Sequence, residues 1–318
     1  MKSASSSDRL ALGRKLGDGL SLARMHLAKR GKPIDCAPFE ANLAEYDAIL
    51  TRHGGPSLKR ARVVEVGFGA RPIRLAWLAS AGIDVRGIDA DEPMLRLKPS
   101  RVVAIWRRNG AERALKSAAR ALILGDKEWR DAAEAFAKHH PGLPFRVPTG
   151  RLSVGDAADP AVWAALGAAD FIYSEDVFEH IEPDRLPAVV DGMAAALSRS
   201  GVALIRPQMF AGLAGGHSID WYRGDLDAEK PRRAPPWDHL REHRFPANTY
   251  LNRLRYDDYV ALFQRRFDIV ETVENAPGCG ARFLTREIEG ELSAYSRREL
   301  LTNDLGFVLR PKAGPISA

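Results

Sequence analysis

Cysteine is scarce in this chain, and long apolar runs are missing. Only Cys36 and Cys279 occur among 318 residues, and they form no C-x-x-C pair. This excludes a disulfide framework and the usual cysteine spacing of zinc and redox sites. No run approaches the roughly 18 consecutive apolar residues of a membrane span, and residues 1–18 lack the apolar core of a secretory signal. We therefore expect a cytoplasmic protein without a membrane span.

Acidic residues are outnumbered, but only in parts of the chain. Lys and Arg exceed Asp and Glu by 47 to 41, a formal net charge of +6. Residues 1–60 hold 11 basic against 6 acidic side chains and residues 96–151 hold 13 against 5, whereas the remainder holds 23 against 30. The basicity therefore belongs to two segments, and it does not indicate a nucleic-acid surface over the whole fold.

Short apolar runs alternate with stretches of helical spacing through most of the chain. This alternation is typical of a parallel sheet covered by helices on both faces, an α/β, Rossmann-like, doubly wound fold. Strands are predicted at Arg62–Val66, Val85–Ile88, Leu152–Val154, Phe171–Tyr173, Val202–Ile205, Asp268–Val273 and Gly306–Leu309. Helices are predicted from Ile73, Glu92, Pro160 and Asp184, near Asp257–Arg265, and at Arg286–Leu300.

The sequence divides into a leading helical part and a main domain. Helical spacing at residues 8–30 and 37–52 predicts an N-terminal helical cap over residues 1–58. The main domain is predicted at residues 59–318, where the alternating elements lie.

Two segments of the main domain are longer than a minimal fold requires. Residues 98–148, between the second and third strands, predict a helical insertion with helices at Arg101–Leu124 and Lys127–His139. Residues 207–254 are rich in Gly, Pro, His, Trp and Tyr, and they predict a long functional loop.

The first predicted strand runs into a glycine-rich turn, Glu65-Val66-Gly67-Phe68-Gly69. Glycines at this point allow the tight turn and the close backbone approach that a bound cofactor needs. A dinucleotide-binding turn would need a third glycine where Pro72 stands, so a nicotinamide cofactor is disfavoured. Asp89-Ala90 closes the second strand, where an acidic residue binds ribose hydroxyls in several cofactor families.

Further motifs lie at the next three strands. Asp156-Ala157 ends the third, Ser174-Glu175 ends the fourth, and Ser200-Gly201 precedes the fifth. Together with the glycine turn they resemble the motifs of class I S-adenosylmethionine-dependent methyltransferases, with Arg71 in place of a usual glycine. The resemblance implies a seven-stranded sheet with an antiparallel end and S-adenosyl-L-methionine as cofactor. It places the cofactor against Glu65, Gly67, Phe68, Gly69, Asp89, Ala90, Asp156, Ala157, Ser174 and Glu175.

The fourth strand continues into Asp176-Val177-Phe178-Glu179-His180, similar to the motif of small-molecule O-methyltransferases. On a helical turn, Asp176 shares a face with Glu179 and His180. A neutral imidazole accepts a hydroxyl proton, so His180 is the predicted base with Asp176 beside it, and His217 is the next candidate. We predict no resident metal. The alternative, similar to ubiquinone-biosynthesis O-methyltransferases, is a divalent ion held by Asp176, Glu179 and His180.

The predicted acceptor is a hydroxyl of a small molecule or glycan, because residues 215–252 resemble bacterial glycan and secondary-metabolite methyltransferases. His217, His239 and His243 are candidate acceptor contacts, and the basic insertion is a predicted lid that favours an acidic acceptor. One alternative is an RNA methyltransferase, favoured by the pI of 9.4, although no RNA-binding module is recognisable. Another is a cofactor-binding protein without catalysis, which Arg71 leaves open.

Overall fold

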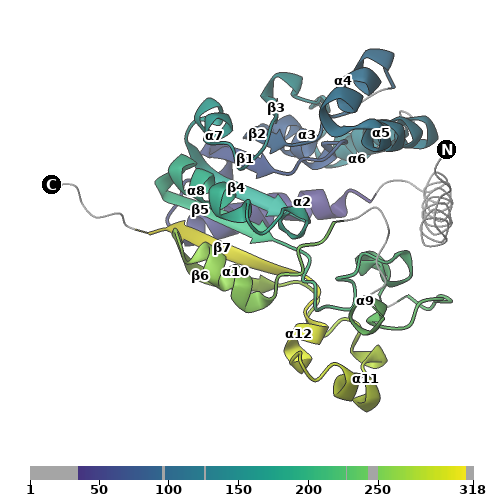
Figure 1. Cartoon of the computed structure of the whole chain (residues 1–318). Coiled ribbons are helices and arrows are strands. Elements are labelled where there is room, and N and C mark those ends of the chain that lie inside the picture. The colour runs from purple at the N-terminus through teal and green to yellow at the C-terminus, as the bar shows by residue number, and fades with distance from the viewer. Residues whose placement is uncertain (1–34, 95–96, 125–126, 227, 243–249, 313–318) are drawn as a thin grey trace, which may run out of the picture.

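The chain forms a seven-stranded sheet with helices on both faces and a smaller helical part at one end (Figure 1). The computed structural model describes residues 35–94, 97–124, 127–226, 228–242 and 250–312. The helix predicted at residues 8–30 lies outside this described part. Within the described part, no helix combines the length and the apolar character that a membrane crossing requires.

The strands confirm the predicted parallel sheet and its antiparallel end. They are β1 (Arg62–Val66), β2 (Asp84–Asp89), β3 (Leu152–Val154), β4 (Ala169–Glu175), β5 (Leu197–Arg206), β6 (Phe267–Glu274) and β7 (Leu305–Pro311). The first five run parallel, and β7 pairs antiparallel with both β5 and β6. The order β3-β2-β1-β4-β5-β7-β6 is the one expected of a class I methyltransferase sheet.

Helices cover the sheet and build the segments beside it. The described helices are α2 (Ala37–Arg52), α3 (Ile73–Ser80), α4 (Pro99–Asn109), α5 (Ala111–Leu124), α6 (Lys127–His139), α7 (Pro160–Leu166), α8 (Leu186–Ala196), α9 (Asp238–Arg241), α10 (Tyr256–Phe263), α11 (Arg286–Glu291) and α12 (Arg297–Leu301).

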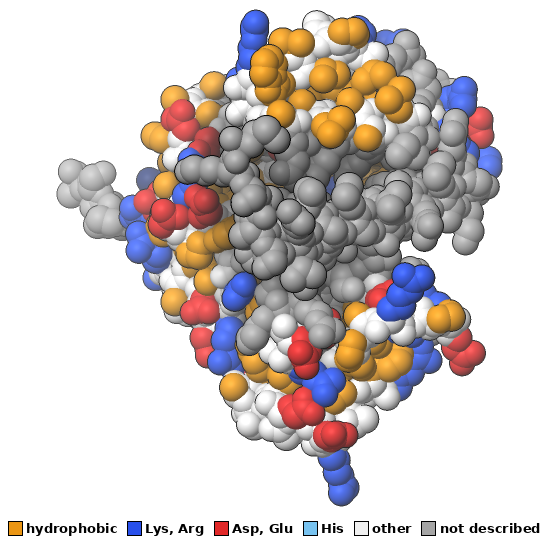
Figure 2. Space-filling view, turned by 45° about the vertical axis from the view of Figure 1, so that its right-hand side comes forward, with side chains coloured by type: hydrophobic (Ala, Val, Ile, Leu, Met, Phe, Trp, Pro, Cys, Tyr) orange, Lys and Arg blue, Asp and Glu red, His pale blue; other side chains and the backbone are white. Residues whose placement is uncertain are grey.

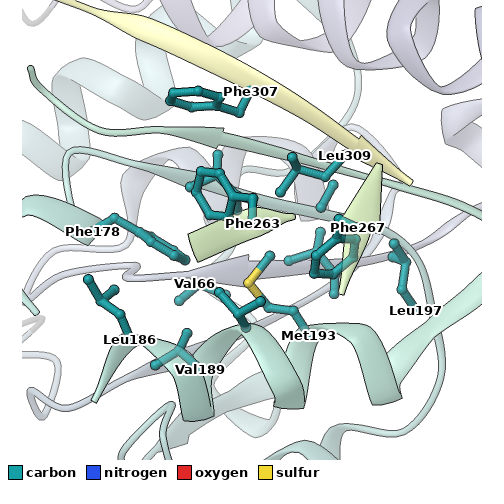
Figure 3. Close-up of a cluster of buried hydrophobic side chains, with 14 of the residues drawn as sticks. Val66, Phe178, Leu186, Val189, Met193, Leu197, Phe263, Phe267, Phe307 and Leu309 are labelled. Carbon is teal, nitrogen blue, oxygen red and sulfur yellow. The ribbon is translucent and has the colours of Figure 1, made fainter. Parts of the chain in front are cut away.

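Alternate strand residues contribute to two cores, one on each face of the sheet. On one face, Val66 and Phe307 pack with side chains of α8 and α10 (Figure 3). On the other face, Phe171 packs with Tyr46 of α2 and with α3. Successive side chains of a strand point to opposite faces, so a strand covered on both sides needs a continuous apolar run. Helix α2 is therefore part of the helical layer that covers the sheet.

The insertion contains three helices where two are predicted. Gly110 has φ 86° and ends α4, so Arg101–Leu124 is a helical hairpin and not one helix. Helix α6 has its predicted bounds, and its Phe136 packs against Trp77 of α3. The helix predicted from Glu92 begins only at Pro99, because the amide of Met94 donates to the carbonyl of Ala70 and holds this segment against the glycine turn.

The described parts of residues 207–254, predicted as a loop, contribute to a smaller core at one end of the sheet. Leu213 and Trp237 are buried there with side chains of α11 and α12. The helix predicted at Arg286–Leu300 is broken into α11 and α12, because Ser296 caps α12 by accepting a hydrogen bond from the Glu299 amide at 3.2 Å. The aromatic content of residues 207–254 therefore serves packing as well as any contact with a ligand.

Candidate functional site

The glycine turn after β1 has the backbone that the sequence predicts. Gly67 has φ 88°, and a Cβ atom there would lie 2.1 Å from Val177. Gly69 has φ 68°, and a Cβ atom there would meet nothing within 4 Å. Gly67 is therefore required by close packing, whereas Gly69 faces open space in which a ligand can approach the backbone. Phe68 is buried in the core beneath the turn.

Asp89 joins this turn to the end of β2. Its carboxylate accepts hydrogen bonds from the amides of Gly69 at 2.6 Å and Asp91 at 2.7 Å. Burial raises the pKa of Asp89 to about 6, although the Gly69 amide acts in the opposite direction. The structure thus brings two predicted cofactor residues, far apart in sequence, into direct contact.

Asp156 and Ala157 follow β3 at the same edge of the sheet. The amide of Gly155 donates to the carbonyl of Asp89 at 2.9 Å, which places the two loops side by side. Asp156 forms an ion pair with Arg185 and accepts from the Ala158 amide at 2.9 Å. The carbonyl of Ala157 accepts from the Trp163 indole at 2.7 Å.

The α4–α5 hairpin lies beside these loops. Asn109 donates to the carbonyl of Ala90 at 3.1 Å, and Arg113 pairs with Asp91. The insertion therefore contacts the side where cofactor residues are predicted, while α6 is fixed in the core. Hydrophobic side chains gather on the upper part of the molecule in Figure 2, and the large exposed ones of the hairpin are Val103, Trp106, Leu115 and Leu122.

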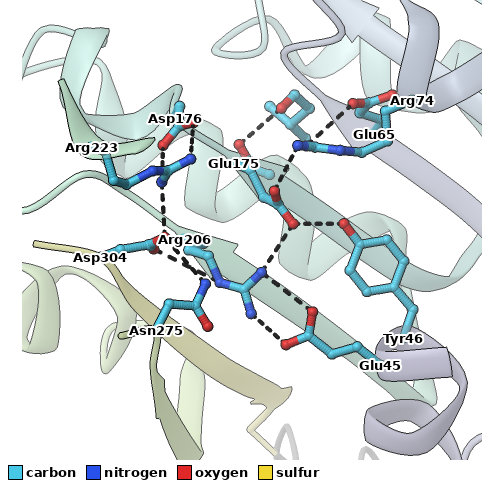
Figure 4. Close-up of polar contacts among 12 residues, drawn as sticks. Glu45, Tyr46, Glu65, Arg74, Glu175, Asp176, Arg206, Arg223, Asn275 and Asp304 are labelled. Carbon is cyan, nitrogen blue, oxygen red and sulfur yellow. Dashed lines mark hydrogen bonds and ion pairs between the residues drawn. The ribbon is translucent and has the colours of Figure 1, made fainter. Parts of the chain in front are cut away.

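Three other predicted cofactor residues have side chains directed into the protein. Ser174 donates to the carbonyl of Val66 at 2.8 Å, and Glu65 is buried, which raises its pKa to about 7. Glu175 lies between Arg74 at 2.7 Å and Arg206 at 3.0 Å (Figure 4). Burial opposes ionisation of Glu175, but these two guanidinium groups lower its pKa below the usual range. The Glu175 carboxylate therefore links β4 to α3 and to β5 through its ion pairs.

This polar network continues through residues that the sequence does not single out. Arg206, 3% exposed, pairs with Glu45 of α2 at 2.6 Å, and Tyr46 donates to Glu175 at 2.7 Å (Figure 4). Asp304 lies 3.9 Å from Arg206, and burial raises its pKa to about 6. The one sequence signal is the position of Arg206, a cation that directly ends an apolar strand.

The prediction of a helical turn directly after β4 is wrong. Asp176 has φ 58°, in the left-handed region, and the following residues form only a 3₁₀ turn at Phe178–His180. The Asp176 carboxylate accepts from both terminal nitrogens of Arg223, at 2.9 and 3.0 Å (Figure 4). Asp176 is thus paired with Arg223, and it does not share a helical face with Glu179 and His180.

The structure instead brings Glu179, His180 and His217 together. The Oε1 atom of Glu179 lies 3.8 Å from Nε2 of His180 and 3.8 Å from Nε2 of His217. Burial, followed by the nearby Asp176, raises the pKa of Glu179 well above its ordinary value. Burial lowers the pKa of His180 below 6.5 and that of His217 to about 3, so both imidazoles are neutral at physiological pH. We refer to these three residues as the Glu-His-His cluster.

Of the other two predicted acceptor contacts, His239 lies in the described part, and its ring is against Gly216, the residue before His217. His239 is buried, and its Nε2 atom lies 2.9 Å from the carbonyl of Phe210. Burial lowers the pKa of His239 to about 4. His239 therefore packs among described residues of the 207–242 segment, and His243 lies outside the described residues.

Comparisons with known proteins give fold likenesses only. No family model and no curated protein matches the chain. A TehB-like SAM-dependent methyltransferase from Corynebacterium glutamicum is 15% identical, with TM-score 0.39 over 87% of this chain and 96% of its own. Magnesium protoporphyrin IX methyltransferase ChlM from Synechocystis, with bound SAH, is 14% identical, with TM-score 0.41 over 88% and 85%. The CcbJ methyltransferase from Streptomyces caelestis is 13% identical, with TM-score 0.42 over 89% and 92%. The strand order itself makes this a class I S-adenosylmethionine-dependent methyltransferase fold.

Proposed function

We propose that this chain transfers a methyl group from S-adenosyl-L-methionine to a hydroxyl of a small-molecule or glycan-type acceptor. The observation that carries the proposal is the contact between Asp89 and the Gly69 amide at the carboxyl edge of the parallel strands. It places an open, left-handed glycine and an acidic residue at the edge where ligands bind in sheets of this kind.

The residues at this edge fit the proposed cofactor. The open backbone at Gly69 suits the aminocarboxypropyl part, and each carboxylate oxygen of Asp89 keeps a lone pair for a ribose hydroxyl. Asp156 and Ala157, beside Asp89, suit the adenine. When bound, the cofactor supplies a methyl group that its sulfonium charge already activates. The protein then has to position the acceptor oxygen and accommodate its proton.

The Glu-His-His cluster suits that second task. It follows β4 and β5, and β4 pairs with β1, whose end carries the glycine turn. A neutral imidazole can accept a hydroxyl proton, and His180 is 35% exposed at its side chain, so an acceptor can reach it. Asp176 contributes through Arg223 by fixing the segment that carries the cluster.

The insertion is proposed as a cover for the bound ligands. Helix α6 contributes Ala132 and Phe136 to a buried core with Trp77, so the part that we propose as the cover is the α4–α5 hairpin. The positive charge of residues 96–151 favours an acidic acceptor, such as a phosphate-linked or nucleotide-linked sugar.

The proposal is tested by incubating the purified chain with methyl-labelled cofactor and fractionated cell extract. Label in an alkali-stable glycan or metabolite fraction supports it. Label in RNA instead supports the RNA methyltransferase. Cofactor binding without label in any fraction supports a non-catalytic binding protein, so each alternative has its own outcome.

A further inference from the structure

The spacing within the Glu-His-His cluster suits a metal ion better than mutual hydrogen bonds. One ligand atom from each residue lies within 4.8 Å of the other two. The separations of 3.8 Å from Glu179 to His180 and to His217 are too long for hydrogen bonds. Two ligand atoms that are both about 2.1 Å from one ion lie roughly 3 to 4 Å apart. The three residues therefore surround a point that an ion can occupy with small side-chain movements.

The cluster also contains buried polar atoms without partners. Glu179 is 2% exposed, and among the described residues neither of its carboxylate oxygens has a partner with full hydrogen-bond geometry, although the backbone amides of Glu179 and Gln208 lie near the carboxylate. The Nε2 atom of His217 is likewise buried without one. The neighbouring cation, Arg223, is directed to Asp176 and Asp304. Because an ionised carboxylate is costly to bury, a cation bound among these three residues would stabilise the ionised form of Glu179.

The ring of His180 is already oriented for such an ion. Its Nδ1 atom lies 2.9 Å from the carbonyl of Tyr250. A carbonyl only accepts, so Nδ1 carries the proton and Nε2 presents its lone pair toward Glu179. A backbone carbonyl on the far ring nitrogen is the usual support of a metal-binding histidine. His217 has φ 53°, a strained backbone for a residue with a side chain, and such strain concentrates at functional sites.

From these contacts we propose that Glu179, His180 and His217 bind one divalent transition-metal ion. Two imidazoles and one carboxylate suit Zn²⁺, Fe²⁺, Co²⁺ or Mn²⁺, whereas Mg²⁺ prefers oxygen ligands alone. The proposal departs from the prediction of no resident metal, and its ligand set differs from the alternative drawn from the motif, because His217 takes the place of Asp176.

The role of the ion in turnover rests on the proposed methyl transfer. Three protein ligands leave open positions, and an acceptor hydroxyl that reaches the ion releases its proton to water more readily. The acceptor oxygen then bonds to the methyl carbon as the sulfur–carbon bond breaks and neutral S-adenosylhomocysteine leaves. His180 acts in this case as a ligand and not as the base.

The test is a titration of the full chain, stripped with EDTA, with Co²⁺ followed by visible absorption and calorimetry. We expect one Co²⁺ per chain, displaced by Zn²⁺ and not by an equal concentration of Mg²⁺. Glu179→Gln, His180→Ala and His217→Ala should each weaken binding at least about tenfold, while circular dichroism confirms that they fold. His53→Ala, a histidine paired with Glu271 away from the cluster, should bind Co²⁺ as the unaltered chain does.

The contrast with Asp176→Asn decides between the two ligand sets. We expect this variant to lose no more than about threefold in Co²⁺ affinity, because Asp176 is not a ligand in the proposed set and acts on the cluster only through its nearby charge, which salt screens. An equal loss in Asp176→Asn, no stoichiometric Co²⁺ binding, or unchanged binding in all three ligand variants would overturn the proposal. S-adenosylhomocysteine binding is measured on the same metal-free chain. Failure of metal binding alone therefore leaves the proposed function standing, and failure of cofactor binding alone removes that function but not the metal site.

Discussion

Arg223 donates two hydrogen bonds to the carboxylate of Asp176, at 2.9 and 3.0 Å, and a third to Asp304 at 2.8 Å. These contacts tie the segment around Arg223 to the end of β4 and to the residue that precedes β7. They also hold Asp176 in its left-handed conformation, separate from the Glu-His-His cluster.

We predict that Arg223→Met destabilises the fold by about 1 to 3 kcal/mol, because it removes charged hydrogen bonds from two carboxylates, of which Asp304 is 6% exposed. The measurement is urea-induced unfolding. Arg241→Met is the matched control from the same segment, since Arg241 pairs with Glu291 at the surface and should cost less than about 1 kcal/mol. Equal losses of unfolding free energy in the two variants would show that the Arg223 contacts stabilise the fold no more than a surface ion pair does.

The two glycines of the turn after β1 should respond differently to alanine. Gly69→Ala should cost about 1 kcal/mol of stability for its left-handed backbone and weaken binding of S-adenosylhomocysteine. Gly67→Ala should cost about 1 to 3 kcal/mol more, because its Cβ atom meets Val177 at 2.1 Å. Gly142→Ala, also at positive φ but in an open loop of the insertion, is the control for the backbone cost. Thermal unfolding measures the stability cost and calorimetry measures binding of S-adenosylhomocysteine. An equal loss of binding in Gly142→Ala and Gly69→Ala would contradict this account.

Asp89→Ala should weaken S-adenosylhomocysteine binding by about 1 to 3 kcal/mol, through loss of hydrogen bonds to a charged group. Asp84→Ala, at the opposite end of the same strand, should leave the affinity unchanged. The pH dependence gives a second readout. With a pKa of about 6, Asp89 takes up its proton as the pH falls through 6, so affinity at pH 5 should be up to about tenfold weaker than at pH 7.5.

The pH dependence of fold stability that comes from Asp89 has the opposite sign to the pH dependence of binding. The folded-state pKa of Asp89 lies above the ordinary value of 3.8, so the ionised carboxylate costs stability above pH 6 and the cost is relieved as the pH falls. Asp89→Asn should remove both dependences. If S-adenosylhomocysteine affinity still fell with pH in a folded Asp89→Asn chain, the pH dependence would belong to another group.

His180→Ala should lower turnover by about 10² to 10⁴-fold while S-adenosylhomocysteine affinity changes little, whether His180 acts as base or as metal ligand. Steady-state kinetics with the identified acceptor and calorimetry with S-adenosylhomocysteine provide the two readouts. His53→Ala is the control for a histidine outside the site. Full activity of the His180→Ala chain would return His180 to a purely structural role and leave His217 as the next candidate base.

Local signals were sufficient to predict the sheet. Apolar runs such as Arg62–Val66 and Leu152–Val154 are bounded by glycines and polar residues, and the observed strands match them closely. The positions of the glycine turn and of Asp89 were also predictable, because each directly follows or ends a strand and the carboxyl ends of parallel strands meet at one edge of the sheet.

The candidate catalytic residues depended on contacts that sequence spacing does not contain. The direction of Asp176 is set by Arg223, 47 residues away, so helical spacing placed it on the wrong face. His217 joins Glu179 only because the chain after β5 returns to the end of β4. The buried network around Arg206 likewise combines α2, β4 and β5, which no local pattern connects.

The central claim is that the carboxyl edge of this sheet binds S-adenosyl-L-methionine, and isothermal titration calorimetry tests it most directly. S-adenosylhomocysteine and NAD are titrated separately into the purified full chain and into its Asp89→Ala variant. We predict saturable binding of one S-adenosylhomocysteine per chain, weakened in the variant, and no heat of binding with NAD. Binding of NAD without S-adenosylhomocysteine, or binding of S-adenosylhomocysteine that is unaffected in a folded Asp89→Ala chain, would contradict the account.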